Sequence, residues 1–324
     1  MKRLVCILVA ALAAAQVGAC WGADAIRVAV QKTGTFSWEL AVMRAHGLDK
    51  QANLSIKVQE LASPEAGKIA LRSGDADIII SDWLWVSRER ALGAKLTFYP
   101  YSSALGGVMV PDSSSIKTLA GLKGHRLAVA GGPLDKNWLL MRASLQRDGL
   151  DVKSEATIVY GAPPLVAAAV LNGGADATLN YWNFCAALED KGFRRIATTQ
   201  DVVTKLGAKG PVAMLGYVFD KQWGDAHRDA LTRFIEVSRK AKEILASSDN
   251  EWQSISRLTG APDASTLRLY RDRYREGIPR RPVEDEESDA RILYRVLAKI
   301  GGPDLVGPGA ELDPGTFYHL LPGD

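Results

Sequence analysis

The sequence predicts an α/β protein with two similar lobes, each built on a doubly wound, mostly parallel sheet flanked by helices. One observation is an internal repeat, in which residues 27–30 (RVAV) align with residues 126–129 (RLAV). The other is that short aliphatic runs alternate with helical segments inside each copy. Such alternation favours right-handed crossovers and a doubly wound sheet, so two copies predict two lobes.

The repeat extends well beyond its first strand. The same register pairs prolines, glycines and tryptophans in order: Pro64 with Pro163, Gly74 with Gly173, and Trp83 with Trp182. Proline is tolerated in the first turn of a helix, and glycine favours the left-handed position that ends one. Each copy therefore predicts a helix that begins at its proline and ends at its glycine.

The remaining elements of each copy follow from residue type. Aliphatic and β-branched runs suited to buried parallel strands lie at residues 26–30, 54–58 and 76–80, and again at 125–130, 156–160 and 175–179. The first two strands of each copy enclose another helix, at residues 37–46 and 134–147.

The chain outside the repeats completes the two lobes. Residues 96–101 predict one more strand of the first lobe, and residues 106–110 and 211–219 predict the two strands that cross between lobes. Residues 225–246 have the spacing of an amphipathic helix, and the helical chain after it is expected to pack back on the first lobe. The predicted lobes are thus residues 26–105 with 214–324, and residues 106–213.

The N-terminus is typical of a secretory signal. Basic residues at positions 2 and 3 precede an apolar run at residues 4–17, which is shorter than the roughly 20 residues needed to span a bilayer. Small residues up to position 25 follow, so the mature chain is expected to start at Ile26 in the periplasm. The alternative is a lipobox at residues 17–20, in which Cys20 would be acylated and anchor the protein.

Composition argues against several classes of protein. The formal charge of +3 is spread along the chain without a basic cluster, so nucleic acid is not an expected partner. Cys185 is the one cysteine beyond the signal, which leaves no pair for an internal disulfide. The four histidines are far apart, and no nucleophile–base or dinucleotide motif is present. We therefore expect neither an enzyme nor a cofactor.

Three phrases identify a family resemblance: IALRSGDAD at residues 69–77, LAGLKGHRLAV at 119–129 and VLNGGADA at 170–177. With them the chain resembles, over residues 26–250, the solute-binding proteins of nitrate-, sulfonate- and taurine-type ABC importers, including the pyrimidine-precursor-binding members. The resemblance implies a periplasmic-binding-protein fold of the second topological type. It also implies a monomer with hinge closure, delivering its solute to an ABC permease in the inner membrane.

The ligand is expected where the loops at the carboxyl ends of the strands face one another. These loops and the helix starts beside them contain the candidate ligand-binding residues: Thr35, Phe36, Trp38, Glu39, Glu65, Asp82, Trp83, Trp85, Asp135, Asn137, Trp138, Tyr181 and Trp182. Because Trp83 and Trp182 occupy matching loops, they could sandwich a flat or quaternary-ammonium group. The alternative for each tryptophan is packing beneath its own helix.

The same loops are acidic, with Glu39, Glu65, Asp82 and Asp135 against Lys32 and Lys136. A buried unpaired carboxylate costs several kcal/mol, so acids in the closed cleft need a lysine, a ligand amine or a metal ion as partner. The alternative is that these acids cap helices. The prediction is a small organic solute that is aromatic, heterocyclic or amine-bearing. A hard cation or metal chelate bound by the four carboxylates, and an oxyanion such as nitrate or sulfonate, remain alternatives.

Overall fold

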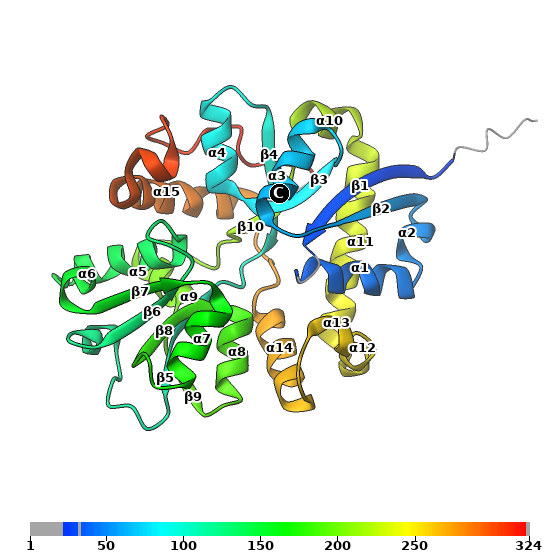
Figure 1. Cartoon of the computed structure of the whole chain (residues 1–324). Helices are drawn as coiled ribbons and strands as arrows, with labels where there is room; N and C mark the ends of the chain where they lie inside the picture. The colour runs from blue at the N-terminus through cyan, green and yellow to red at the C-terminus, as the bar shows by residue number, and fades with distance from the viewer. Residues whose placement is uncertain (1–21, 32–33, 322–324) are drawn as a thin grey trace, which may run out of the picture.

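The structure is a computed structural model that describes residues 22–31 and 34–321 (Figure 1). The predicted signal up to residue 21, with Cys20, and the loop residue Lys32 lie outside these ranges. The described chain forms two five-stranded mixed sheets, each flanked by helices, as the sequence predicts. No helix within the described ranges is long and apolar enough to cross a membrane.

The first sheet has the order β2-β1-β3-β10-β4. Its strands are β1 (Asp24–Gln31), β2 (Leu54–Leu61), β3 (Ile78–Asp82), β4 (Leu96–Ser102) and β10 (Leu215–Asp220). β1 pairs in parallel with β2 and β3, whereas β10 runs antiparallel to β3 and β4. The side chains of Ile26, Val28 and Ile78 are fully buried, which explains the unbroken aliphatic runs in these strands.

The second sheet repeats this arrangement in the order β7-β6-β8-β5-β9. Its strands are β5 (Gly106–Pro111), β6 (Arg126–Ala130), β7 (Thr157–Gly161), β8 (Ala177–Tyr181) and β9 (Phe193–Thr198). β6 is parallel to β7 and β8, and β5 is antiparallel to β8 and β9. The three strands of each copy of the repeat therefore occupy equivalent places in the two sheets.

The helices between the strands follow the same symmetry. The first lobe contains α1 (Phe36–Ala45), α2 (Leu48–Gln51), α3 (Pro64–Ser73), α4 (Trp83–Ala91), α10 (Lys221–Ala226) and α11 (Arg228–Ser247). The second contains the 3₁₀ turn η1 (Leu119–Leu122), α5 (Lys136–Arg147), α6 (Val152–Glu155), α7 (Pro163–Leu171), α8 (Trp182–Glu189) and α9 (Thr199–Lys205). α3 begins at Pro64 and ends at Gly74, whose φ of 78° is left-handed, as predicted.

The chain passes from one sheet to the other twice, after Ser102 and after Thr198. β10 begins at Leu215, later than the residue 211 expected from the apolar pattern. The reason is that the chain before it bonds to other parts of the molecule. The carbonyl of Pro211 accepts from Arg281 (2.9 Å), and the amide of Ala213 donates to Glu286 (2.7 Å).

The C-terminal part is helical, with α12 (Asp249–Ser254), α13 (Ser256–Thr259), α14 (Ala264–Glu276) and α15 (Val283–Val306). α11 packs on α1 of the first lobe, as expected, but α14 packs on α8 and α15 packs on both α4 and α5. The expectation that this whole segment packs on the first lobe is therefore incomplete. An apolar stripe shows that a helix face is buried, and does not show against which partner.

Candidate ligand-binding site between the lobes

The loops of the two lobes meet at an ion pair. Asp82 ends β3 in the first lobe, and Lys136 begins α5 after the first strand of the second copy. The Nζ atom of Lys136 donates to Oδ2 of Asp82 at 3.1 Å. Side chains that follow the carboxyl ends of parallel strands in the two sheets therefore bond to each other, and this edge of the strands is where ligands bind in open α/β sheets.

Asp82 makes two structural hydrogen bonds at this position. It caps α4, because its Oδ1 atom accepts from the amide of Trp85 at 2.8 Å, while its other oxygen receives Lys136. Burial on its own would raise the pKa of Asp82, but the charge of Lys136 and the Trp85 amide lower it. Asp82 is thus an ionised carboxylate with its charge already compensated.

Asp135 is the acid that precedes α5 in the second lobe. It caps α5 by accepting from the amide of Trp138 at 3.2 Å, and its Oδ2 accepts from the hydroxyl of Tyr181 at 3.1 Å. Burial raises the pKa of Asp135 despite the nearby Lys136, and burial with the Asp135 charge raises the pKa of Tyr181. Burial alone would lower the pKa of Lys136, but Asp82 and Asp135 raise it, so Lys136 and Tyr181 remain donors at neutral pH.

An aromatic cluster joins the lobes beside these polar groups. The ring of Trp182, at the start of α8, lies 6.0 Å from that of Trp38 in α1, with the planes at 82°. Tyr270 of α14 stacks on Trp38 at 6.2 Å and meets Trp182 edge-on at 6.1 Å. Trp38 is buried and Trp182 is partly exposed, so Trp182 presents the accessible ring of this cluster.

Trp83 lies in a different environment from Trp182, although the repeat places both at the first position of a helix. It is 0% exposed, and its ring is tilted against Tyr294 of α15 at 6.5 Å. This is the packing role that the sequence left as the alternative. A ligand sandwich between Trp83 and Trp182 stays a prediction, and Trp83 has no accessible surface for it in this conformation.

The other predicted aromatic residues divide between the core and the surface. Phe36 packs edge-on against Tyr101 and Tyr217, and Trp138 is fully buried. Trp85 is partly exposed, with Lys68 5.1 Å from its ring centroid.

The remaining predicted residues also lie in different environments. Glu65 lines a shallow pocket of about 370 Å³ together with Trp85, on the surface of α3 and α4. Thr35 shares a hydrogen bond with Tyr101 (3.1 Å), and Asn137 is partly exposed in the first turn of α5.

Glu39 belongs to the core of the first lobe. It is 0% exposed and accepts from Lys242, from the hydroxyl of Ser238 (3.1 Å) and from the hydroxyl of Tyr274 (2.6 Å). Its partners come from α11 and α14, about two hundred residues later in the chain. Ser238 and Lys242 interrupt the apolar stripe of α11, and that pattern was the available sign of a buried polar partner.

The predicted convergence of Glu39, Glu65, Asp82 and Asp135 on a metal ion is wrong. Among the described residues, no group of three or more His, Cys, Asp or Glu side chains could hold a metal. Glu39 is engaged in the core and Glu65 lies on the outer surface of α3. Asp82 and Asp135 each cap a helix, and the cation between them is Lys136.

Comparison with known proteins identifies the family of this chain. The family model described as NMT1/THI5 like matches residues 39–251. The chain belongs to the NMT1/THI5-like family. No curated protein sequence matches the chain.

Solved structures show which fold this family member has. The chain is similar to the periplasmic aliphatic sulphonate binding protein SsuA from Escherichia coli (20% identity, covering 92% of this chain and 93% of that one, TM-score 0.74). It is also similar to the alkanesulfonate-binding protein SsuA from Xanthomonas axonopodis pv. citri bound to MOPS (20% identity, 89% and 96%, TM-score 0.64). A third is a ligand-binding component of an ABC-type import system from Staphylococcus aureus with zinc bound (13%, 89% and 94%, TM-score 0.61). The predicted periplasmic-binding-protein fold of type II is confirmed.

Proposed function

We propose that this protein is the solute-binding component of an ABC importer, which works in the periplasm and delivers its ligand to an inner-membrane permease. The family and the fold support this assignment, since similar structures include periplasmic binding proteins. The observation that supports it most strongly is the pair Lys136–Asp82, which joins the ligand-facing edges of the two lobes. We expect the two lobes to close over a small molecule by hinge bending.

The ligand is an aromatic or heterocyclic organic solute. Trp182 supplies a partly exposed ring against which a flat group can pack. Lys136 and Tyr181 supply donors, and Asp135 supplies an acceptor, which together match the mixed edge of a heterocycle. Because Lys136 already neutralises Asp82, the cleft does not require a cationic ligand, and an amine would have to displace that lysine.

An oxyanion is the second candidate, because two similar structures are of sulfonate-binding proteins. Within the described part of the cleft the ammonium of Lys136 is held by Asp82 and faces Asp135. An anion bound at Lys136 would therefore meet two carboxylates. This repulsion favours the heterocyclic ligand.

A thermal-shift screen over pyrimidines, aromatic acids, amines, sulfonates and metal ions tests the proposal. A solute at a hundredfold its Kd should stabilise the protein by about 2.7 kcal/mol, which gives a clear rise in Tm. Trp182→Ala should then weaken binding of that solute about tenfold or more, corresponding to about 1.4 kcal/mol. Calorimetry on wild type and variant gives the two Kd values.

Trp223→Ala is the matched control, because Trp223 of α10 is also partly exposed but stacks on His227, away from the cleft residues. It should bind the solute like wild type. A solute whose affinity is unchanged by Trp182→Ala would contradict binding at this aromatic cluster. Stabilisation by a metal ion alone, on chelator-treated protein, would contradict an organic ligand.

A further inference from the structure

The two lobes differ on one face, although the duplication makes that face equivalent in both. In the second lobe no residue is charged from position 156 to position 175, a stretch that contains β7 and α7. The equivalent stretch of the first lobe, residues 56–76, contains most of β2 and all of α3. Its charged residues are Lys57, Glu60, Glu65, Lys68, Arg72 and Asp75. Because both sheets have the same strand arrangement, the fold does not require an uncharged face in the second lobe.

The helix α7 is apolar on its outer side as well as its inner side. Leu165, Ala168 and Leu171 are exposed and follow one another at a spacing of three residues, so they share one face of the helix. Leu165 is 67% exposed, whereas Val166 and Val170 are buried where α7 packs on β6 and β8. Figure 1 shows α7 on the near face of the second sheet. A surface helix normally has a polar outer face, so this one indicates that another surface covers it.

The strand β7 beside this helix is an unprotected sheet edge. It is the outermost strand of the second sheet, and within the described chain it pairs with β6 alone. Val159 of β7 is 54% exposed and lies on the α7 side of the sheet, because it pairs with Ala128, which clusters with Val166. Edge strands are usually protected from other chains by charged side chains or prolines. β2, the equivalent edge, has Lys57 and Glu60, whereas β7 has neither a charge nor a proline.

We propose that the apolar face, formed by Val159, Leu165, Ala168 and Leu171, binds a second copy of this protein about a two-fold axis. β7 of one copy then pairs antiparallel with β7 of the other, which is the pairing that a two-fold axis gives to identical strands. In the register centred on Val159, the Val159 side chains of the two copies lie opposite each other on the α7 side. An interface that meets itself places like charges together, and a face without charge avoids that repulsion.

This interface leaves the two ligand sites separate. Asp82, Lys136 and Trp182 are not part of the apolar face, which belongs to the second lobe alone. The second lobes of a pair would form a fixed centre, and each first lobe would still move relative to it. The dimer goes beyond the proposed function and differs from the monomer that the family resemblance implies. Because the face is small, we expect a weak dimer with a Kd in the micromolar range. Distances within one chain are measured below that Kd, where the protein is monomeric.

Sedimentation velocity from one to several hundred micromolar protein tests the proposal. Wild type should shift from monomer to dimer, and Leu165→Glu and Val159→Lys should each raise the dimer Kd about tenfold or more. The duplication supplies matched controls in the first lobe. Ile69→Glu changes an equally exposed side chain (68%) of α3, and Gln59→Lys changes the exposed position of β2 that corresponds to Val159. Both controls should dimerise like wild type.

Hydrogen exchange gives a second measurement that needs no variant. Amide exchange in β7 of wild type should slow as the protein concentration rises through the Kd, because new hydrogen bonds form along that edge, while exchange in β2 should stay the same.

Three results would overturn the proposal. They are a monomer throughout the concentration range, a dimer whose Kd is unchanged by Leu165→Glu and Val159→Lys, and equal weakening by the first-lobe variants. A monomer would mean that a different molecule covers the apolar face. No solute enters these experiments, so their failure leaves the proposed function intact, and a failed solute screen leaves the dimer intact.

Discussion

At the scale of single residues, Glu286 is the buried acid with the clearest consequence for pH. It is 1% exposed at the start of α15, and its Oε2 atom accepts from the amide of Ala213 in the chain that leads into β10. Burial raises the pKa of Glu286 to about 7, and the charge of Asp289 contributes in the same direction, against Arg281 and the Ala213 amide. This segment joins the two sheets, so its attachment to α15 depends on pH.

Glu286→Gln should change how stability depends on pH. The folded protein keeps the Glu286 proton up to about pH 7, whereas the unfolded chain loses it near the ordinary value of 4.5. The contribution of Glu286 to the free energy of unfolding is fully present below pH 4.5. It falls by about 3 kcal/mol as the pH rises from 4.5 through 7. Relative to wild type, Glu286→Gln should therefore gain stability between pH 5.5 and 8.5, measured by urea unfolding.

Glu284→Gln is the control, because Glu284 is exposed in the same turn. It removes the same formal charge without removing a buried carboxyl, so the gain on going from pH 5.5 to 8.5 should be larger in Glu286→Gln than in Glu284→Gln. A difference between Glu286→Gln and wild type that is the same at pH 5.5 and 8.5 would show that Glu286 does not titrate as described.

The residue types predicted helix capping, which is local, better than hydrogen bonds between segments that are distant in the sequence. Asp82 and Asp135 precede helices, and capping, which the sequence left open as an alternative, is the role both have. The hydrogen bonds of Glu39 with Lys242 and Tyr274 could not be predicted from the sequence, because they join α1 to helices from the far end of the chain. Sequence spacing shows which side chains share a face, and does not show which faces meet.

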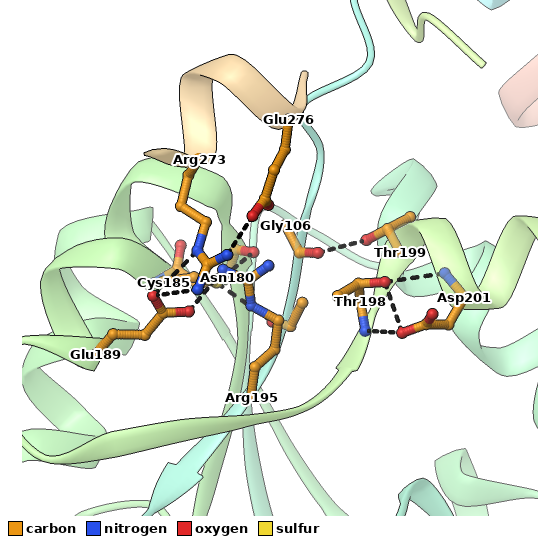
Figure 2. A network of polar contacts seen from close by, with 11 residues as sticks. Gly106, Asn180, Cys185, Glu189, Arg195, Thr198, Thr199, Asp201, Arg273 and Glu276 are labelled. Atoms are coloured by element: carbon orange, nitrogen blue, oxygen red, sulfur yellow. Dashed lines mark hydrogen bonds and ion pairs between the residues drawn. The ribbon is translucent and has the colours of Figure 1, made fainter. Parts of the chain in front are cut away.

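At the scale of elements, α14 connects the two lobes. On one side Tyr274 donates to Glu39 of the first lobe, and on the other Arg273 pairs with Glu189 of α8, which Arg195 of β9 also contacts at 2.7 Å (Figure 2). Since Arg273 and Glu189 are both mostly buried, their pair belongs to a network and contributes more than an isolated surface pair.

Arg273→Ala should loosen α14 from the second lobe. In the variant, Arg195 is the remaining ion-pair partner of Glu189, and the contact to α14 is lost. We expect a loss of about 1 kcal/mol of stability and faster amide hydrogen exchange in α14 and α8. Hydrogen exchange followed by mass spectrometry measures the change in each peptide. Arg268→Ala on the same helix should leave exchange unchanged, and unchanged exchange in Arg273→Ala would contradict the bridging role of α14.

Elements were predictable where local chemistry defines them. Prolines predicted the first residues of α3 and α7, and Gly74 predicted the end of α3, whereas α7 already ends at Leu171, before Gly173. Aliphatic runs predicted the parallel strands. The start of β10 was misplaced, because residues 211–214 are apolar but bond to Arg281 and Glu286 outside the sheet. α14 packs on α8 with the ion pair Arg273–Glu189, and α15 packs on α5; both contacts join segments distant in sequence, which no local pattern reveals.

At the scale of the whole molecule, one duplication explains both lobes and the place where their loops meet. The repeat predicted two equivalent sheets, and their loops do meet at Asp82 and Lys136. The structure is a conformation in which the lobes are in contact. A binding protein of this kind should open and close about the two connecting stretches, with the ligand favouring the closed form.

The most direct test is the distance between the lobes, measured by pulsed electron resonance on spin labels at Ile69→Cys in α3 and Leu165→Cys in α7. These side chains are 68% and 67% exposed, whereas Cys185 is buried with its pKa raised by burial to about 12, so it should stay unlabelled once Cys6 and Cys20 are replaced by serine. The saturating solute from the thermal screen should shorten and narrow the distance distribution. A distribution that stays the same while calorimetry shows full occupancy would contradict closure of the two lobes over a ligand.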